Sequence, residues 1–362
     1  MSEQINSKLP DSTTGSDDLP KNNLSSIMTW QTSEELNKLL PTPNPFSGNR
    51  SIERYGFLHV LNNICDLRIS RRAFAEWVHG WIWDEHPSAD ILHLGGLPRD
   101  VTVIVRSIAE QKALINEGFQ RTFVGGLPFS YIEKQHGLRS RHNLLAFPPH
   151  SAELEKITTS QSEYMDYLES IKNNYESIYV SIFYLDWNGP IHRAAEDRGL
   201  KVIQGARPDD AASLTRMRSI FDAFEQVTSN TMGSHFLYAL YSGCRFSICG
   251  PQYIYKPEDF LKNRNPDRRL REKIDKIISV QQPQYLKARF GKFFTSSPLE
   301  GQADVGFAKD EIGERHRLTP EQIIDALGWS LRGQLAGYAA SAIRRAQRLK
   351  RPKVEVKVDP NV

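Results

Sequence analysis

Short apolar runs alternate with longer amphipathic segments through the second half of the chain. The run SIYVSIFYLD is followed by the helix-like GPIHRAAEDRGL, and then by KVIQGA, DDAASLTRMRSIFDAF, EQVTSN, MGSHFLYALYSG and CRFSICGP. The short runs have the composition of buried strands, and Gly199 and Gly243 follow helix-like segments as C-terminal glycines do. Strands that alternate with helices in this way predict a parallel, doubly wound α/β sheet.

The first half shows the same alternation more weakly. DVTVIVRSIAEQKALINEGFQRTFVGG predicts strand, helix, strand, and NLLAFPPHS predicts a short buried strand stopped by two prolines. We therefore expect an α/β protein with two Rossmann-like domains, at residues 46–165 and 175–335. Residues 1–45 are expected to form a disordered or loosely attached leader, and 336–362 a basic helix and tail. No G-x-G-x-x-G motif follows a first strand, which weakens a dinucleotide-binding interpretation.

The bulk composition narrows the class of protein. The chain has 362 residues, of which 39% are hydrophobic and 25% charged, as in ordinary globular proteins. A net charge of +3 does not favour nucleic acid as a partner. The longest apolar runs are far shorter than the ~20 residues of a membrane span, and the N-terminus does not resemble a secretory signal. The three cysteines make no disulfide framework. We expect a soluble, cytoplasmic protein.

The segment VTSNTMGSHFLYALYSGCRFSICGP, residues 227–251, concentrates hydroxyl groups between a predicted strand and a predicted helix. Ligands of open parallel sheets bind at the carboxyl ends of strands, and helix N-termini attract phosphate. Thr228, Ser229, Thr231 and Ser234 can donate hydrogen bonds there, and Gly233 allows the backbone to approach a ligand. The alternative is that Thr231 is simply a helix N-cap within ordinary turn chemistry.

Two cationic side chains accompany this segment. His235 lies in the predicted first helical turn and can pair with a phosphate, although a lone histidine is more often structural. Arg207 is the nearest arginine candidate in the sequence. Together the segment and these residues predict a phosphate site.

The same segment resembles the donor-binding segment of bacterial surface-polysaccharide glycosyltransferases with the GT-B architecture. VGGLPFSYI and LLAFPPHS are similar to first-domain segments of that broad group, and AKDEIGERHRLTPEQIIDALGW to its closing helical region. The resemblance implies two Rossmann-like domains facing each other across a cleft, with the acceptor in the first and a nucleotide-sugar in the second. The expected nucleotide-sugar-binding residues are Thr228, Ser229, Asn230, Thr231, Gly233, Ser234, His235 and Arg207.

Sugar transfer also requires a base and stabilisation of the leaving phosphate. In the first half, EWVHGWIWDEHPSADILHLGG places Asp84 and Glu85 among tryptophans, and aromatic surroundings can raise a carboxyl pKa to that of a base. The alternative is an amphipathic helix with buried aromatic residues and solvated charges. Because the chain has no D-x-D and this cluster lacks H-x-x-x-H spacing, we expect neither a metal nor another cofactor.

Two further catalytic candidates end predicted strands. His150, in FPPHS, is expected to face the cleft from the first domain. Asp186, in YLDWNGP, ends the first strand of the second domain and serves equally well as a cap for the next helix.

The C-terminal segment is basic, with seven Lys and Arg between Arg344 and Lys357 against one Glu. This pattern fits either a solvated helix end or attachment to an anionic membrane surface, where lipid-linked acceptors are found.

The sequence therefore predicts a metal-independent glycosyltransferase that inverts the anomeric centre in a single displacement. Its substrates would be a nucleotide-sugar and a glycan or lipid-linked acceptor of cell-surface polysaccharide or lipopolysaccharide. CMP-linked acidic sugars, UDP-sugars and GDP-sugars all stay open as donors. Two alternatives stay open as well: a nucleotide-sugar 2-epimerase of the same architecture, and a non-catalytic carbohydrate-binding or scaffold protein.

Overall fold

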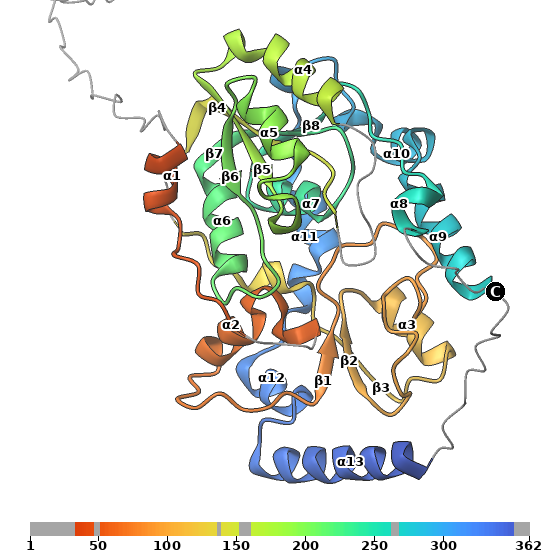
Figure 1. The fold of residues 1–362 in the computed structure, drawn as a ribbon. Coiled ribbons are helices and arrows are strands. Elements are labelled where there is room, and N and C mark those ends of the chain that lie inside the picture. Colours follow the sequence, from red (N-terminus) through yellow and green to blue (C-terminus); the bar gives the residue numbers. More distant parts are fainter. Residues whose placement is uncertain (1–32, 47–50, 136–138, 152–160, 262–267, 351–362) are drawn as a thin grey trace, which may run out of the picture.

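The computed structural model of the chain describes residues 33–46, 51–135, 139–151, 161–261 and 268–350. Within them the chain forms two parallel sheets flanked by helices (Figure 1). The first sheet has three strands, in the order β1 (Ala75–Trp77), β2 (Thr102–Val105), β3 (Arg121–Val124). Helix α3 (Ile108–Asn116) joins β2 to β3, as the sequence predicts. We call this sheet with its helices the first unit.

The second sheet has five strands in the order β6-β5-β4-β7-β8, and all neighbouring pairs are parallel. The strands are β4 (Ser140–Phe147), β5 (Ser177–Ile182), β6 (Lys201–Gln204), β7 (Phe224–Ser229) and β8 (Arg245–Ile248). They are connected through α4 (Ser162–Ser170), α5 (Pro190–Glu196), α6 (Ser213–Ala223) and α7 (Ser234–Tyr241). The expected α/β class with parallel, Rossmann-like sheets is confirmed. We call this sheet with its helices the second unit.

Strand β4 corrects the expected division of the chain. The sequence assigned LLAFPPHS to a first domain ending at residue 165, but Leu144 pairs with Ile178 of β5, and Leu145 with Val227 of β7. The strand is therefore the centre of the second sheet. Apolar pattern shows that a strand is buried but not which strands it joins, because parallel partners are remote in sequence.

The N-terminal segment also differs from expectation. Residues 33–39 form helix α1 (Ser33–Leu39), and Leu36 and Leu40 are buried in the core. Further along, the backbone N–H of Asn44 donates to the carboxylate of Asp210 at 2.7 Å. The described part of the expected leader thus packs on the second unit, while residues 1–32 lie outside the described residues.

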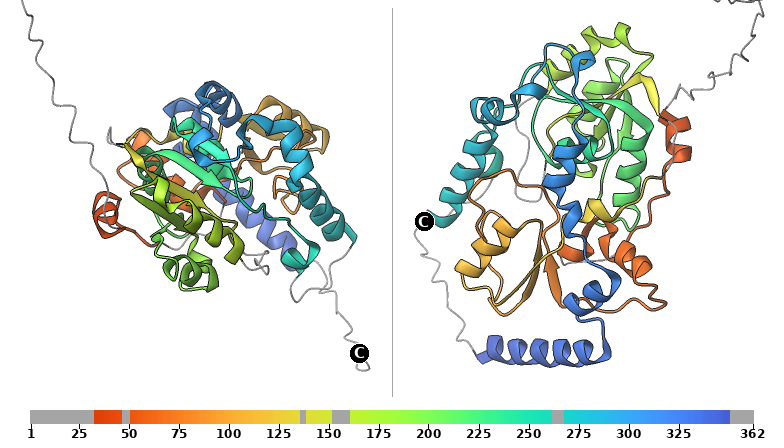
Figure 2. Two further views of the ribbon diagram at one scale, coloured as in Figure 1. Left: turned by 90° about the horizontal axis from the view of Figure 1, so that it is seen from above. Right: turned by 180° about the vertical axis from the view of Figure 1, so that it is seen from behind.

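The remaining helices are α2 (Phe57–Ile64), α8 (Pro257–Leu261), α9 (Arg268–Gln281), α10 (Pro283–Phe290), α11 (Val305–Ile312), α12 (Pro320–Ala326) and α13 (Leu331–Lys350). The last three run from the second unit back to the first (Figure 2, right). Arg106, after β2, pairs with Glu311 of α11 at 2.6 Å, and Phe74 N donates to Leu327 O. The expected second domain, 175–335, therefore ends in helices that pack on the first unit.

The two units share one hydrophobic core. Trp81, after β1, stacks on Phe236 of α7 with ring centroids 5.4 Å apart. Phe129, after β3, stacks on Tyr238 of the same helix at 4.2 Å. Helix α7 consequently lies between the sheets, together with α11 (Figure 1).

No helix in the described ranges is both long and apolar enough to cross a membrane.

Candidate functional site

The order of the second sheet defines where a ligand would bind. From the central strand β4 the chain proceeds outward through β5 and β6, and then crosses back to β7 and β8 on the other side. The carboxyl ends of β4 and β7 are neighbours, with Phe147 opposite Ser229. Such a reversal opens a crevice at the carboxyl ends of the two strands, and open α/β sheets bind ligands there. The hydroxyl-rich segment follows β7 directly.

Most polar groups of this segment fasten strand ends together. Ser229 Oγ donates to Phe147 O at 2.6 Å and accepts from Thr231 N at 3.1 Å. Asn230 Nδ2 donates to Pro251 O at 2.9 Å. These hydrogen bonds join the carboxyl ends of β4, β7 and β8. We call this edge of the second sheet, with residues 229–235, the rim.

Thr228 and the helix cap differ from the sequence expectation. Thr228 is fully buried inside the sheet, where its hydroxyl donates to Ser247 O at 3.3 Å. Successive strand residues face opposite sides, so Thr228 points away from the side that Ser229 faces. The N-cap of α7 is Gly233, not Thr231, and no side chain caps the helix. The backbone of Gly233 is extended, with φ −172°.

Two buried polar atoms of the segment have no hydrogen-bond partner among the described residues: Asn230 Oδ1 and His235 Nε2. Native proteins pair nearly all such atoms, so each exception calls for an explanation, of which a ligand is one. The ring of His235 stacks on Phe147 at 5.1 Å and lies over Gly233, where a Cβ would be 2.8 Å from Nδ1. Glycine at 233 therefore makes room for this ring.

Burial, followed by the nearby His150, lowers the pKa of His235 to about 3, although a backbone hydrogen bond with Thr231 acts in the opposite direction. The imidazole is therefore neutral at physiological pH. A bound anion would favour its protonated form.

His150 joins this rim from β4, and not from the first unit as expected. It is exposed after two buried prolines, and its ring lies 4.4 Å from that of Phe183. Its Nδ1 is 2.9 Å from Ser151 O. Asp186, after β5, accepts a hydrogen bond from Ser151 N at 2.7 Å. The structure thus brings His150, Asp186 and the 229–235 segment to one edge of the sheet, with Asp186 holding the loop that carries His150.

Three sequence candidates are engaged elsewhere. Arg207 pairs with Asp209 at 2.9 Å, and its guanidinium lies over the ring of Tyr184. Asp84 pairs with Lys276 of α9 at 2.9 Å. Glu85 pairs with Arg289 of α10 at 3.2 Å. The two carboxylates hold the loop after β1 against α9 and α10.

The first unit meets the rim through the loop after β1. Trp81 N donates to Ser234 Oγ at 3.0 Å, and Tyr238 OH donates to His79 O at 2.9 Å. The carboxyl end of β1 therefore faces the N-terminus of α7.

Two cations that sequence reasoning did not select, Arg54 and Lys273, act on His79 and His93 of this loop. We call these four residues the cationic group. Lys273 Nζ lies 3.1 Å from His93 Nδ1. Burial first, and then the charge of Arg54 and the other members, lowers the pKa values of His79 and His93 to about 4. Mutual repulsion of this kind is relieved by an anion. The members come from three separate segments, and only the two histidines lay in the cluster noted in the sequence.

Three of the four strained backbone positions in the described part lie beside these groups. Four non-glycine residues in the described part have left-handed φ: Tyr55 (60°), Asp66 (49°), His93 (59°) and Asn188 (59°). Tyr55 contacts the ring of His79, His93 belongs to the cationic group, and Asn188 follows β5. Strained residues concentrate at functional sites, and no sequence pattern reveals them.

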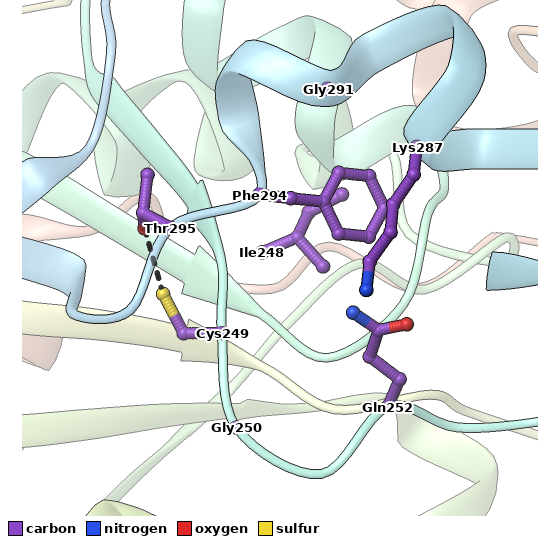
Figure 3. A pocket seen from close by; sticks show the side chains of 8 residues that line it. All are labelled: Ile248, Cys249, Gly250, Gln252, Lys287, Gly291, Phe294 and Thr295. Atoms are coloured by element: carbon purple, nitrogen blue, oxygen red, sulfur yellow. Dashed lines mark hydrogen bonds between the residues drawn. The ribbon is translucent and has the colours of Figure 1, made fainter. Parts of the chain in front are cut away.

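A pocket of about 370 Å³ lies at the carboxyl end of β8 (Figure 3). Lys287 and Gln252 extend toward each other on one side of it, with Phe294 and Ile248 behind them. Because Cys249 N donates to Ser229 O, the pocket adjoins the hydroxyl-rich segment. Its size is within the range of small-molecule sites.

These features define an α/β protein with two parallel sheets and a polar, cation-rich junction at their carboxyl ends. The chain has a structural resemblance to TarM: over 62% of this chain and 42% of the TarM chain, the sequences are 16% identical, with a TM-score of 0.28. A second structure is of a glycine-to-arginine variant of S. aureus TarM in complex with fondaparinux, alpha-GlcNAc-glycerol and UDP. It matches 70% of this chain and 50% of that chain, with 14% identity and a TM-score of 0.30. The matched regions thus span about half of TarM or less.

No protein-family model and no curated protein matches the chain. The function proposed below therefore rests on the chain's own residues.

Proposed function

We propose that the chain is a glycosyltransferase that transfers a sugar from a nucleotide-activated donor to a glycan or lipid-linked acceptor. The observation that carries this proposal is the pair of unpartnered buried atoms, Asn230 Oδ1 and His235 Nε2, in the segment that follows β7 at the crevice. A nucleotide-sugar supplies both kinds of group that these atoms lack: hydroxyl donors and phosphate oxygens.

The donor phosphate would lie at the N-terminus of α7. Backbone N–H groups at a helix start are directed toward such an anion, and the helix dipole favours it. His235 would take up a proton when the phosphate binds and would stabilise the charge on the leaving nucleotide. The pocket at the end of β8 would receive the nucleoside, with Phe294 as an apolar wall and Gln252 as a polar contact.

The acceptor would approach from the first unit. An acceptor hydroxyl would lose its proton to His150, whose ring is exposed and whose Nδ1 lies near Ser151 O. The acceptor oxygen would then form a bond to the anomeric carbon while the bond to the donor phosphate breaks, and the nucleotide would leave with that electron pair. This single displacement inverts the anomeric centre. The cationic group with His79 and Lys273 would hold an anionic part of donor or acceptor.

A nucleotide-binding experiment tests the donor site. The thermal stability of the protein is measured with CMP, UDP, GDP and TDP, each with and without Mg²⁺. One nucleotide at ~100 times its dissociation constant should add about 2.7 kcal/mol of stability, independently of Mg²⁺. His235→Gln should weaken that nucleotide roughly tenfold or more, because a buried charge-assisted hydrogen bond is lost. The matched control is His142→Gln, at an exposed position of β4, which should bind as the wild type does. Stabilisation by none of the nucleotides, or unchanged binding by His235→Gln, would refute the donor site.

Product analysis then tests the reaction. With the nucleotide-sugar that binds, the wild type should form product only when an acceptor is present. His150→Gln should retain donor binding but lose roughly 10²–10⁴-fold in turnover, as expected for a general base. Conversion of the nucleotide-sugar without acceptor would instead identify an epimerase. Binding of the nucleotide-sugar without turnover, whichever acceptor is supplied, would identify a non-catalytic protein.

A further inference from the structure

Helix α13 (Leu331–Lys350) exposes four large hydrophobic side chains. Four of the eleven exposed large hydrophobic residues in the described part lie on this one helix. Leu331 is 79% exposed, Leu335 75%, Ile343 59% and Tyr338 52%. A single exposed leucine needs no explanation, but such a concentration marks an interaction surface.

The helix is turned with its small residues toward the protein. A Cβ at Gly337 would be 2.4 Å from the ring of Phe74, and one at Gly333 would be 2.8 Å from the backbone of Gly328. Gln334 Nε2 donates to Gly328 O at 2.7 Å. These contacts anchor the inner face, so the orientation of the exposed residues is fixed by packing.

The outer face is continuous. Leu331, Leu335 and Ala342 lie on one stripe of the helix by their spacing, with Ala339 and Ala346 beside it. The three alanines are exposed as well. In Figures 1 and 2 the helix lies along the outer boundary of the molecule, beyond the three-stranded sheet. The apolar stripe is thus open to an approaching surface.

The charge of α13 indicates which kind of partner would cover the apolar stripe. Its sequence contains Arg332, Arg344, Arg345, Arg348 and Lys350 and no acidic residue. Of these, Arg344 pairs with Asp100 at 2.8 Å. A symmetric dimer through this stripe would bring the like charges of two helices together, which is unfavourable. An anionic lipid surface accepts both the apolar stripe and the cations.

We propose that α13 binds in the plane of an anionic lipid bilayer, with Leu331, Leu335 and Ile343 in the boundary between headgroups and acyl chains. Helices with an apolar face and basic flanks bind membranes in this way. The sequence had pointed only to electrostatic attachment through 344–357. Of that segment, residues 351–357 lie outside the described residues, and the apolar stripe begins earlier, at Leu331. This inference does not depend on the reaction proposed above, since lipid binding and nucleotide binding are measured separately.

Co-sedimentation of the full-length protein with vesicles tests the proposal. The wild type should bind vesicles of phosphatidylcholine mixed with phosphatidylglycerol and bind phosphatidylcholine alone much more weakly. The double variant Leu331→Gln, Leu335→Gln should lose roughly tenfold or more in partitioning, because two apolar side chains no longer leave water. Arg345→Gln should reduce binding to the anionic vesicles only. The matched control is Leu299→Gln, an exposed leucine elsewhere, which should partition as the wild type does.

Two results would overturn the proposal. One is wild-type binding that is absent, or that the double variant leaves unchanged. The other is a dimer, detected by sedimentation velocity, that the double variant abolishes, because the stripe would then pair with a second copy. Since both leucines are largely exposed, the double variant should unfold at the wild-type temperature, which separates loss of binding from loss of fold.

Discussion

Acidification should destabilise the protein through His235. Burial lowers the pKa of this histidine from 6.5 to about 3 in the folded state. Below pH 6.5 the unfolded chain takes up a proton at this position while the folded chain does not. The stabilisation is therefore complete above pH 6.5 and is lost as the pH falls toward 3.

The magnitude follows from the two pKa values. At about pH 5, the linkage relation gives a loss of about 2 kcal/mol for His235, whereas at about pH 7.5 the effect is negligible. His79, with a pKa lowered to about 4, should contribute a similar loss. Against a total stability of ~5–15 kcal/mol, these losses are large.

Urea denaturation of wild type and His235→Gln at the two pH values measures the effect. The wild type should lose about 2 kcal/mol more than His235→Gln between about pH 7.5 and about pH 5, because glutamine does not titrate. His142→Gln, at an exposed position, serves as the control and should show the wild-type slope. Equal slopes for wild type and His235→Gln would show that the ring is hydrated in the folded protein, and the description of the site as closed around His235 would be wrong.

Two further predictions concern the packing that supports the site. Gly126 has φ +72°, and a Cβ there would be 2.7 Å from Gly313 O, whereas Gly118 has φ +89° with nothing within 4 Å. By urea denaturation, Gly118→Ala should cost about 1 kcal/mol and Gly126→Ala clearly more, because its clash is with backbone; equal costs would contradict the tight packing of α11 against β3. Asp222→Asn should cost about 3–5 kcal/mol, because it leaves Arg218, paired at 3.1 Å, as an uncompensated buried charge. A loss below about 1 kcal/mol in the same measurement would show that Arg218 finds another partner.

Local pattern was sufficient for most elements. The runs before and after MGSHFLYALYSG became β7 and β8, and the segment itself became α7. These elements could be predicted because burial on both faces of a parallel sheet leaves continuous apolar runs, and glycines mark the helix ends. The position of the hydroxyl-rich segment at a strand's carboxyl end followed from the same pattern.

The sheet to which each strand belongs could not be predicted. LLAF reads equally well as the last strand of a first sheet or as the centre of a second one. Only pairing with Ile178 and Val227 decides the matter. This pairing moved His150 from the first unit to the rim beside His235.

Side-chain partners were equally hidden. Asp84 and Glu85 resembled catalytic carboxylates, but Lys276 and Arg289 pair with them from helices about two hundred residues further along the chain. The cationic group with His79 and Lys273 arises from the same long-range folding. Ion pairs form between the charged groups that the fold brings together. The spacing of these groups in the sequence therefore does not predict which of them pair.

The sequence by itself determined the class of fold, the order of most strands and helices, and the segment on which a phosphate site would form. These depend on apolar periodicity, turn residues and helix ends, which are properties of neighbouring residues. The tertiary structure alone decided which strands lie side by side, which charged groups are neutralised, and which buried atoms lack partners. It also turned α13 so that Gly337 faces Phe74, Gly333 faces Gly328, and Leu331 and Leu335 face outward. Those outcomes depend on contacts between remote segments, because close packing and charge pairing act on distance in space and not along the chain.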